Sequence, residues 1–442
     1  MTEEKQTRFN EIAQKHGDPW IWGIYLTLIV ISIVESYSAA SREVAAHGVY
    51  VPVIKQCLFL GVGALLVYGL HRFDYNKNFF LLAMIPGLAI VTALLLVYVM
   101  FFGDFINGAR RSFHIAFFSV QPSELAKLSI VTLLSYFLAK NQRNRDVSWR
   151  GIILSLAAIG LYGLLMFRSG FTNTAILAAV SVSMLVIGGA KWKKIGIVMV
   201  VFVLVAGVVA GLKFHNDKTD KAIGQDTEMV AQSSGAKSNV NPEDRSKMRM
   251  GRVSQFLKNK DSLVYMPITD INQQEMFSRM AQAHGGVYGV GPGRSRECSR
   301  LPLAFSDYIY SIIIEETGLI GGLFVMVLYL WLLARAAMIV RRSRRVLPSL
   351  LIIGTAAMVT YQALCHMAIN VGVVPVSGQP LPLVSMGGTS IIVMSIAFGI
   401  MLSVSRTIAN YNNKNNKPDS AVLPAGLDAE NPTQIAPKHV WK

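Results

Sequence analysis

Long apolar stretches dominate this chain and constrain its fold more than any other feature. A helix needs about 20 apolar residues to cross a bilayer. We predict ten such helices, at 19–39, 52–71, 79–102, 122–139, 151–168, 172–190, 195–212, 308–334, 347–367 and 386–405. Of the 442 residues 52% are hydrophobic and only 15% charged, which excludes a soluble enzyme or a disordered chain. The sequence therefore predicts an all-α polytopic membrane protein.

The positions of the basic residues predict how these helices are oriented. The chain has 42 Lys and Arg residues, 26 Asp and Glu residues and a net charge of +16. If both termini are cytoplasmic, most basic residues fall in the inner segments, among them the clusters at 191–194 and 341–345. Cytoplasmic loops of membrane proteins carry such an excess. The charge therefore indicates topology rather than binding to nucleic acid or to lipid.

The spans divide the chain into five regions. We predict a cytoplasmic N-terminus at 1–18, helices one to seven within 19–212, a large outer loop at 213–304, helices eight to ten within 305–405, and a disordered cytoplasmic tail at 406–442. Apolar residues such as Met276, Phe277 and Met280 predict short helices in the second part of the loop, on the outer mouth of the bundle. The three scattered cysteines indicate neither a structural disulfide nor a zinc site.

Ionisable residues within the spans are functional candidates, because a charge in the membrane must face the protein interior or water. Glu124 and Lys127 are three residues apart near the start of a span, so they share a helix face and can pair. They form either an internal ion pair that only joins helices or part of a charged cavity near the outer leaflet.

Two adjacent arginines, Arg110 and Arg111, precede this span on the predicted outer side. They either extend to the membrane interface or bind a phosphate or pyrophosphate group, for which the guanidinium fork is suited. Because basic residues are otherwise concentrated on the cytoplasmic side, two adjacent arginines on the outer side favour binding of a phosphate or pyrophosphate group.

Two carboxylates mark the span at 308–334. Asp307 opens the predicted helix at the outer interface, as an N-terminal cap or as a reactive group. Glu315 lies eight residues on, which in a continuous helix places it about 12 Å deeper, near the midplane. A single carboxylate at the rim of an apolar bundle is suited to general-base work.

Two glycine-containing stretches lie near these carboxylates in the sequence. The stretch at 285–293 follows no predicted strand, so we reject a dinucleotide fingerprint and expect its backbone to approach Asp307 or a substrate. The stretch at 375–390 must be irregular backbone on the outer side, and such backbone at membrane depth is buried in protein or lines a cavity.

These motifs together resemble the shape, elongation, division and sporulation family of peptidoglycan polymerases, typified by FtsW and RodA. The resemblance covers about residues 19–406 and follows the family's order. Its motifs are Asn-Gly-Ala-Arg-Arg at 107–111, Gln-Pro-Ser-Glu-Leu-Ala-Lys at 121–127, the glycine stretch, Ser-Asp-Tyr-Ile-Tyr at 306–310, and Pro-Leu-Pro-Leu-Val-Ser-Met-Gly-Gly-Thr-Ser at 380–390.

The resemblance implies polymerisation of lipid II into glycan strands at the outer face of the cytoplasmic membrane. It implies that Asp307 is catalytic and deprotonates the acceptor 4-hydroxyl, and that undecaprenyl pyrophosphate leaves with inversion. The implied substrate-binding residues are Arg110, Arg111, Glu124, Lys127 and Ser385, and the supporting residues are Gln121, Ser123, Glu315, Gly286 and Gly289. No cofactor is firmly implied, although a divalent cation, Mg²⁺ or Mn²⁺, stays open and its ligands are unknown.

The family also implies a partner, a single-span class B penicillin-binding protein with transpeptidase activity, within the cell-division machinery. The form of the last motif and the polar tails favour the division member, FtsW, over the elongation member, RodA. A lipid II flippase and a non-catalytic scaffold are the alternatives. The chain departs from the family at His366, where many members have Asn, and at 170–174, where Gly-Phe-Thr-Asn-Thr replaces Pro-Asp-x-Gly-Thr and removes an acidic residue.

Overall fold

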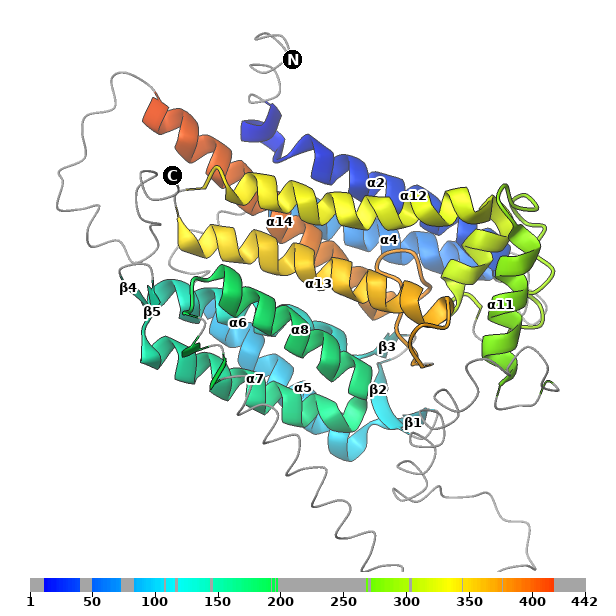
Figure 1. The fold of residues 1–442 in the computed structure, drawn as a ribbon, viewed down its shortest axis with the longest axis horizontal. Coiled ribbons are helices and arrows are strands. Elements are labelled where there is room, and N and C mark those ends of the chain that lie inside the picture. Colours follow the sequence, from blue (N-terminus) through cyan, green and yellow to red (C-terminus); the bar gives the residue numbers. More distant parts are fainter. Residues whose placement is uncertain are drawn as a thin grey trace, which may run out of the picture.

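The helices of this chain run side by side in one elongated bundle (Figure 1). The computed structural model describes residues 12–39, 50–72, 83–106, 109–115, 118–143, 146–191, 193–194, 196–197, 268, 272–301, 304–343, 345–375 and 377–416. One end of the bundle carries helix α11 and a small sheet, and the opposite end carries the start of α2 and the end of α14 (Figure 1). We call these the α11 end and the terminal end.

The described elements are mostly helices. The helices are α2 (Pro19–Ala39), α4 (Tyr50–His71), α5 (Ile85–Phe102), α6 (Pro122–Lys140), α7 (Trp149–Ser169), α8 (Phe171–Ile187), α11 (Gln273–Gly285), α12 (Ile309–Val340), α13 (Val346–Asn370) and α14 (Gly388–Asn416). The strands are β1 (Asp104–Ile106), β2 (Ala109–Ile115), β3 (Phe118–Val120), β4 (Gln142–Arg143) and β5 (Asp146–Val147).

The predicted multi-pass fold is confirmed. Among the described residues, seven helices (α2, α4, α5, α7, α12, α13 and α14) are long and apolar enough to cross a membrane. The predicted spans 19–39, 52–71, 122–139, 151–168, 172–190 and 347–367 each coincide closely with a helix. The predicted seventh span at 195–212 lies almost entirely outside the described residues, as does most of the loop at 213–304. The total of ten therefore stays a prediction.

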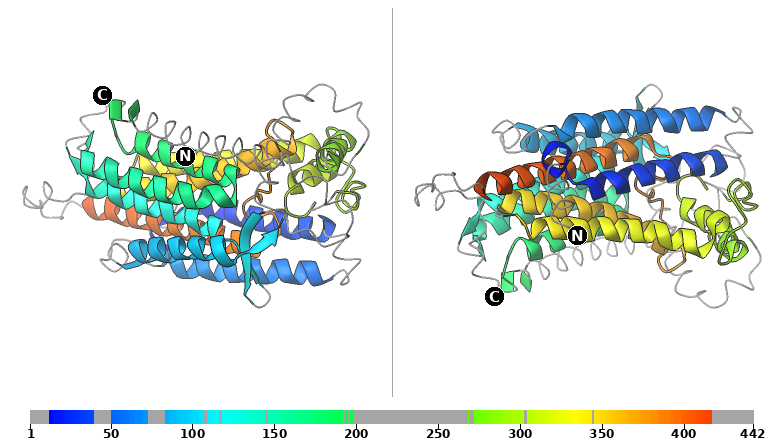
Figure 2. Two further views of the ribbon diagram at one scale, coloured as in Figure 1. Left: turned by 90° about the horizontal axis from the view of Figure 1, so that it is seen from below. Right: turned by 90° about the horizontal axis from the view of Figure 1, so that it is seen from above.

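Helix α13 is the central helix of the bundle. Its apolar window is 94% buried, compared with 22% for α5. It packs against α6, α8, α12 and α14, which surround it. The two further views show the helices sharing one direction while α11 lies across their end (Figure 2). Polar side chains on α13 therefore face protein rather than lipid.

Two helices extend beyond the predicted spans at the terminal end. Helix α12 continues to Val340 and so includes Arg335. Arg335 pairs with Asp18, just before α2, through Oδ2 at 2.7 Å. A charge whose partner comes from another helix can remain inside the bundle. Helix α14 continues to Asn416, so the prediction of disorder from residue 406 is wrong for its first eleven residues. Residues 417–442 lie outside the description.

Helix α12 is broken at Gly318, which has φ 75° and ψ −178°. The Tyr310 hydroxyl donates to the Gly322 carbonyl at 3.2 Å, although a continuous helix would separate these residues by roughly 18 Å. The chain therefore turns sharply at Gly318, and the short arm before it packs against the start of the long arm. The prediction of one continuous helix running inward from Asp307 is wrong.

The position of Glu315 changes with this break. The Ser32 hydroxyl of α2 donates to the Val384 carbonyl, and the next residue, Ser385, bonds the Ser306 carbonyl beside Asp307. The Ser38 hydroxyl of α2 donates instead to Glu316, the neighbour of Glu315. Ser38 is six residues closer to the α11 end than Ser32. Glu315 thus lies nearer the α11 end than Asp307 does, instead of 12 Å deeper in the bundle.

Two small antiparallel sheets accompany the helices and were absent from the all-α prediction. Strands β1, β2 and β3 form a three-stranded sheet between α5 and α6 in sequence, and β4 and β5 form a two-stranded sheet between α6 and α7. The strands have two to seven residues, too few for a clear alternation of polar and apolar residues.

Candidate functional site

Asp307 lies in the turn that precedes α12, between two segments of irregular backbone. Ser306 Oγ donates to its carboxylate Oδ1 at 3.1 Å, and Asn370 Nδ2 donates to its backbone carbonyl at 3.0 Å. A methyl group added to Gly378 would lie 2.9 Å from Oδ2, so the carboxylate is in close contact with the backbone at Gly378. Asp307 is therefore positioned from both sides rather than projecting freely.

The described residues between α13 and α14, 371–375 and 377–387, are irregular, and most of those from 379 on are buried, as the sequence predicts. Leu381 and Leu383 have no exposed surface, and the Tyr329 hydroxyl of α12 donates to the Pro382 carbonyl at 2.6 Å. We call residues 377–387 the inserted segment, because its backbone bonds to residues well inside the bundle. Non-helical backbone at such depth is tolerated only when protein groups satisfy its carbonyls.

One face of α13 supplies those groups. Three polar side chains recur there every fourth residue, so they lie one above another along the helix. Each holds one carbonyl of an irregular segment. The bonds join Gln362 Nε2 to Pro380 (3.2 Å), His366 Nδ1 to Gln379 (2.6 Å) and Asn370 Nδ2 to Asp307 (3.0 Å). This polar face thus sets the position of the inserted segment relative to Asp307.

Glu124 and Lys127 form an ion pair at 2.7 Å, and their side chains have 0% and 1% exposure. Lys127 Nζ also donates to Gln362 Oε1, and Gln362 Nε2 donates to Glu124 Oε2 at 3.3 Å. Of the two interpretations left open by the sequence, this geometry favours the internal ion pair. The pair joins α6 to α13 and, through Gln362, to the inserted segment.

Ser385, predicted to bind substrate, bonds two backbone groups in the structure. Its hydroxyl is buried, accepts from Leu381 N at 2.8 Å and donates to the Ser306 carbonyl at 2.7 Å. Met386 N adds a bond of 3.0 Å to the Phe305 carbonyl. Ser385 therefore holds the inserted segment to the residues before Asp307.

The residues that open α6 contribute to the start of that helix. Gln121 precedes Pro122 at the N-terminus, and its carbonyl accepts from Glu124 N at 3.2 Å. Ser123 is buried and accepts from Asn173 Nδ2 at 3.4 Å. Asn173, one of the departures from the family pattern, thus joins α8 to α6, and its Oδ1 has no hydrogen-bond partner among the described residues.

Arg110 and Arg111 belong to strand β2, where the sequence predicted no regular structure. Arg110 pairs with Phe105 of β1 in the antiparallel register, and a β-bulge interrupts the ladder between Asp104 and Phe105. The strand packs against α5, α6 and α7. The structure thus places the arginine pair on the half of the bundle formed by these helices.

The glycine stretch after α11 approaches α12 and not Asp307. A side chain on Gly285 would lie 2.1 Å from the Ile314 carbonyl oxygen, and one on Gly289 would lie 2.2 Å from that of Glu316. Gly289 also has φ +78°, and Gly286, which ends α11, has φ +52°. The prediction of a close backbone approach is correct, but its target is the short arm of α12.

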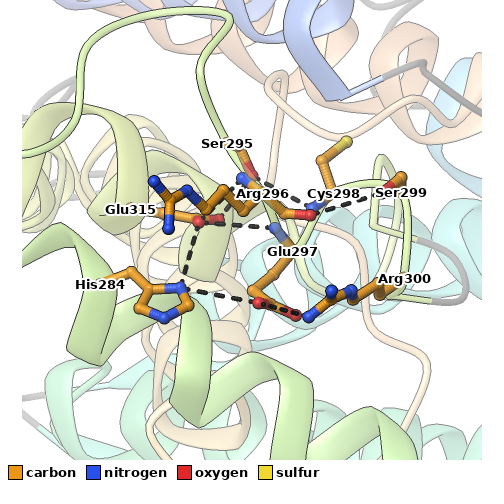
Figure 3. Close-up of polar contacts among 8 residues, drawn as sticks. All are labelled: His284, Ser295, Arg296, Glu297, Cys298, Ser299, Arg300 and Glu315. Carbon is orange, nitrogen blue, oxygen red and sulfur yellow. Dashed lines mark hydrogen bonds and ion pairs between the residues drawn. The ribbon is translucent and has the colours of Figure 1, made fainter.

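Glu315 holds the loop that follows this stretch (Figure 3). Its carboxylate accepts from Ser295 Oγ, from Arg296 N at 3.0 Å and from Glu297 N at 3.4 Å. His284 Nδ1 lies 3.7 Å from Glu315 Oε1 and 3.6 Å from Glu297 Oε1 (Figure 3). These contacts indicate that Glu315 holds this loop at the α11 end, and its predicted supporting role in the site stays a prediction.

A metal site is not evident in the described part of the chain. No group of three or more His, Cys, Asp or Glu side chains there is arranged to hold an ion. The divalent cation that the sequence left open stays a prediction, and no catalytic step is assigned to it.

His366 and Asn370 are site residues that the sequence did not single out as functional. A signal was available, because polar residues at 362, 366 and 370 recur every fourth residue in an otherwise apolar span. Such a stripe on a central helix faces protein, so it must have polar partners there.

Comparison with known proteins agrees with this architecture. The family model for cell cycle proteins of the FtsW, RodA and SpoVE type matches residues 19–410. A probable peptidoglycan glycosyltransferase FtsW from Dichelobacter nodosus is 29% identical over 88% of this chain and 91% of its own length. Another from Xanthomonas oryzae pv. oryzae is 26% identical over 96% of this chain and 80% of its own. Stage V sporulation protein E of Bacillus subtilis is 26% identical, with 87% and 95% covered.

Solved structures show the same fold. A chain from work on the structural coordination of polymerization and crosslinking by a peptidoglycan synthase complex has a TM-score of 0.62 and 23% identity. The match covers 88% of this chain and 97% of that one. The rod shape determining protein RodA of Thermus thermophilus has a TM-score of 0.57 and 20% identity, with 87% and 95% covered. At these identities the structural likeness concerns the fold.

Proposed function

Because this chain belongs to the FtsW, RodA and SpoVE family of cell cycle proteins, we propose that it is a peptidoglycan glycosyltransferase that polymerises lipid II. Relatives named for this activity match nearly the whole chain. The observation that carries the proposal is the carboxylate of Asp307, held between Ser306 and the backbone at Gly378. A carboxylate fixed in this way can accept a proton from a hydroxyl brought to it.

In the proposed reaction, Asp307 accepts the proton of the 4-hydroxyl of the acceptor GlcNAc. The hydroxyl oxygen forms a bond to C1 of the lipid-linked MurNAc, and the bond from C1 to the pyrophosphate oxygen breaks with inversion. Undecaprenyl pyrophosphate leaves with the electron pair of that bond. Fixed positive charges stabilise such a leaving group when they are in place before the reaction.

We assign that stabilisation to Arg110 and Arg111 rather than to Lys127. The charge of Lys127 is already matched by Glu124 at 2.7 Å, and the lysine has only 1% exposure. The bidentate geometry of guanidinium groups suits a pyrophosphate. Lys127 then acts through the inserted segment, which its partner Gln362 holds.

We further propose that the α11 end faces the outside of the cytoplasmic membrane and that septal cell-wall synthesis is the cellular role. The excess of basic residues in segments at the terminal end supports this orientation. A class B penicillin-binding protein is the proposed partner, supported by the similarity to a chain from a peptidoglycan synthase complex.

The test is polymerisation of lipid II by the purified full-length protein, alone and with its transpeptidase partner. Moenomycin is included to inhibit contaminating class A glycosyltransferases. We expect Asp307→Asn to lower the rate by about 100-fold or more, the scale of general-base catalysis. Glu275→Gln, which removes a carboxylate of a partly exposed ion pair on α11, is the matched control and retains activity.

Two results would refute the proposal. One is undiminished polymerisation by a folded Asp307→Asn protein. The other is transfer of lipid II across vesicle membranes without polymerisation, which would identify a flippase.

A further inference from the structure

The polar face of α13 contains one residue whose local chemistry differs from that of its neighbours. Gln362 and Asn370 belong to networks in which both ends of the amide are bonded. His366 lies between them with no exposed surface, and among the described residues its side chain makes one bond, from Nδ1 to the Gln379 carbonyl at 2.6 Å. Its other ring nitrogen, Nε2, has no hydrogen-bond partner among the described residues.

The direction of the single bond is set by chemistry. A backbone carbonyl can only accept, so Nδ1 of His366 carries the hydrogen and donates to Gln379. A buried nitrogen without a hydrogen-bond partner is destabilising, because it has lost its bonds to water. A histidine that only filled space would therefore be unfavourable at this position. The Nδ1 donor is therefore the property that the histidine contributes.

The recipient of this bond is adjacent to the reactive carboxylate. Gln379 follows Gly378, against which Asp307 Oδ2 packs. Asn370, one helical turn beyond His366 on the same face, holds the Asp307 carbonyl. One rigid helix thus holds both the carboxylate and the backbone on which the carboxylate rests.

We propose that His366 is a positioning residue for glycosyl transfer, which fixes the orientation of the Asp307 carboxylate by holding the Gln379 carbonyl. This inference rests on the proposed function, in which Asp307 is the base. Loss of the bond releases the backbone at Gly378, and the carboxylate loses the surface that defines its position. The acceptor is still bound, but fewer of the bound molecules meet a correctly oriented base.

Asn and Gln differ by one methylene group, so substituting each for His366 places an amide donor at a different distance from the backbone. The two variants separate a positioning role from simple packing. In Asn the amide nitrogen is as far from Cβ as Nδ1 of His, whereas in Gln it is as far as Nε2. His366→Asn therefore keeps a donor for Gln379, and His366→Gln moves the donor away. We expect His366→Gln to lower kcat by about tenfold with KM within about twofold, and His366→Asn to stay near the parent protein.

The measurements are steady-state lipid II polymerisation and thermal unfolding of the full-length variants with the transpeptidase partner present. The same pair of substitutions at His71, which is 2% exposed on α4 at the terminal end, is the matched control and leaves kcat unchanged. Should His366→Gln not fold, His366→Met takes its place, because it also lacks a donor at the Nδ1 position.

The outcomes distinguish this inference from the proposed function. A low kcat in His366→Gln or His366→Met, restored in His366→Asn at equal folded fraction, supports the positioning role. Equal activity of the variants, or losses that only follow the folded fraction, overturns it while leaving the polymerase assignment intact. A parent protein that does not polymerise lipid II overturns the proposed function itself.

Discussion

The contact between Gly378 and Asp307 can be tested by adding one methyl group. In Gly378→Ala the new Cβ would lie 2.9 Å from Asp307 Oδ2, 3.5 Å from Cγ and 3.6 Å from Oδ1. Ordinary van der Waals contact begins at 3.4 Å, so Oδ2 must move away by about 0.5 Å. Gly378 has no left-handed φ, so alanine brings no backbone strain of its own.

The expected loss follows from this displacement. A misplacement of about 1 Å can cost roughly 100-fold in rate, so half of that distance corresponds to about tenfold. A tenfold loss equals about 1.4 kcal/mol in the activation free energy. The assay is the initial rate of lipid II polymerisation by Gly378→Ala, and we expect a lower kcat with an unfolding temperature close to that of the parent protein.

Gly387→Ala is the matched control within the same segment. Among the described residues the added Cβ would meet only Ser390 Cβ, at 3.5 Å, which is an ordinary contact. We expect this control to keep its activity within about twofold, since no reacting group must move. Full activity of Gly378→Ala would show that the carboxylate does not depend on this contact, and the positioning argument would then fail.

Two further predictions concern charged pairs. Lys127→Met leaves the buried Glu124 without its cationic partner, so we expect a loss of about 3–5 kcal/mol in the free energy of unfolding. Adding Glu124→Gln should restore part of this loss, and equal stability of the single and double variants would contradict the prediction. For Asp146, burial acts to raise the pKa, but Lys194 at 2.8 Å and Lys191 at 3.5 Å outweigh it, so the pKa lies below its ordinary value of 3.8. A lowered pKa stabilises the fold above pH 3.8, and this stabilisation is lost as the pH falls through the folded-state pKa. Asp146→Asn should therefore lower the unfolding temperature equally at pH 7 and pH 5, and the difference from the parent protein should shrink below pH 3.8. A difference in unfolding temperature that grows on acidification would contradict this prediction.

The sequence was sufficient to predict most of the helical architecture. Long apolar stretches are set by bilayer thickness, so their existence is independent of how the helices pack. The end of α12 was missed because Arg335 in the sequence looks like the end of a span, and its partner Asp18 is more than three hundred residues away. Only the packed structure shows that the charge is paired.

The break in α12 was missed for a different reason. Glu315-Glu316-Thr317 followed by Gly318 is a polar end with a glycine, a pattern typical of a helix C-terminus. The apolar residues on both sides favoured one continuous span instead. The depth of Glu315 and the target of the glycine stretch were predicted wrongly as a result, because both depend on where the short arm lies.

The candidate site was predicted in part. Residue types and spacing identified Asp307 and the pairing of Glu124 with Lys127, since an i, i+3 ion pair is a local property. The contacts of Asp307 with Gly378 and Asn370 join segments about seventy residues apart. Local patterns contain no record of such contacts.

The buried ion pair of α6 has a mechanical consequence. The carboxylate of Asp307 and the inserted segment are tied to α13, whereas β2, which carries the two arginines, packs on α5, α6 and α7. The ion pair and Gln362 lie where α6 meets α13, so they join the part of the bundle that holds Asp307 to the part that carries the arginine strand. Because these bonds are buried and involve charged groups, displacing one part against the other would break them, so they help to fix the spacing between the base and the arginine strand.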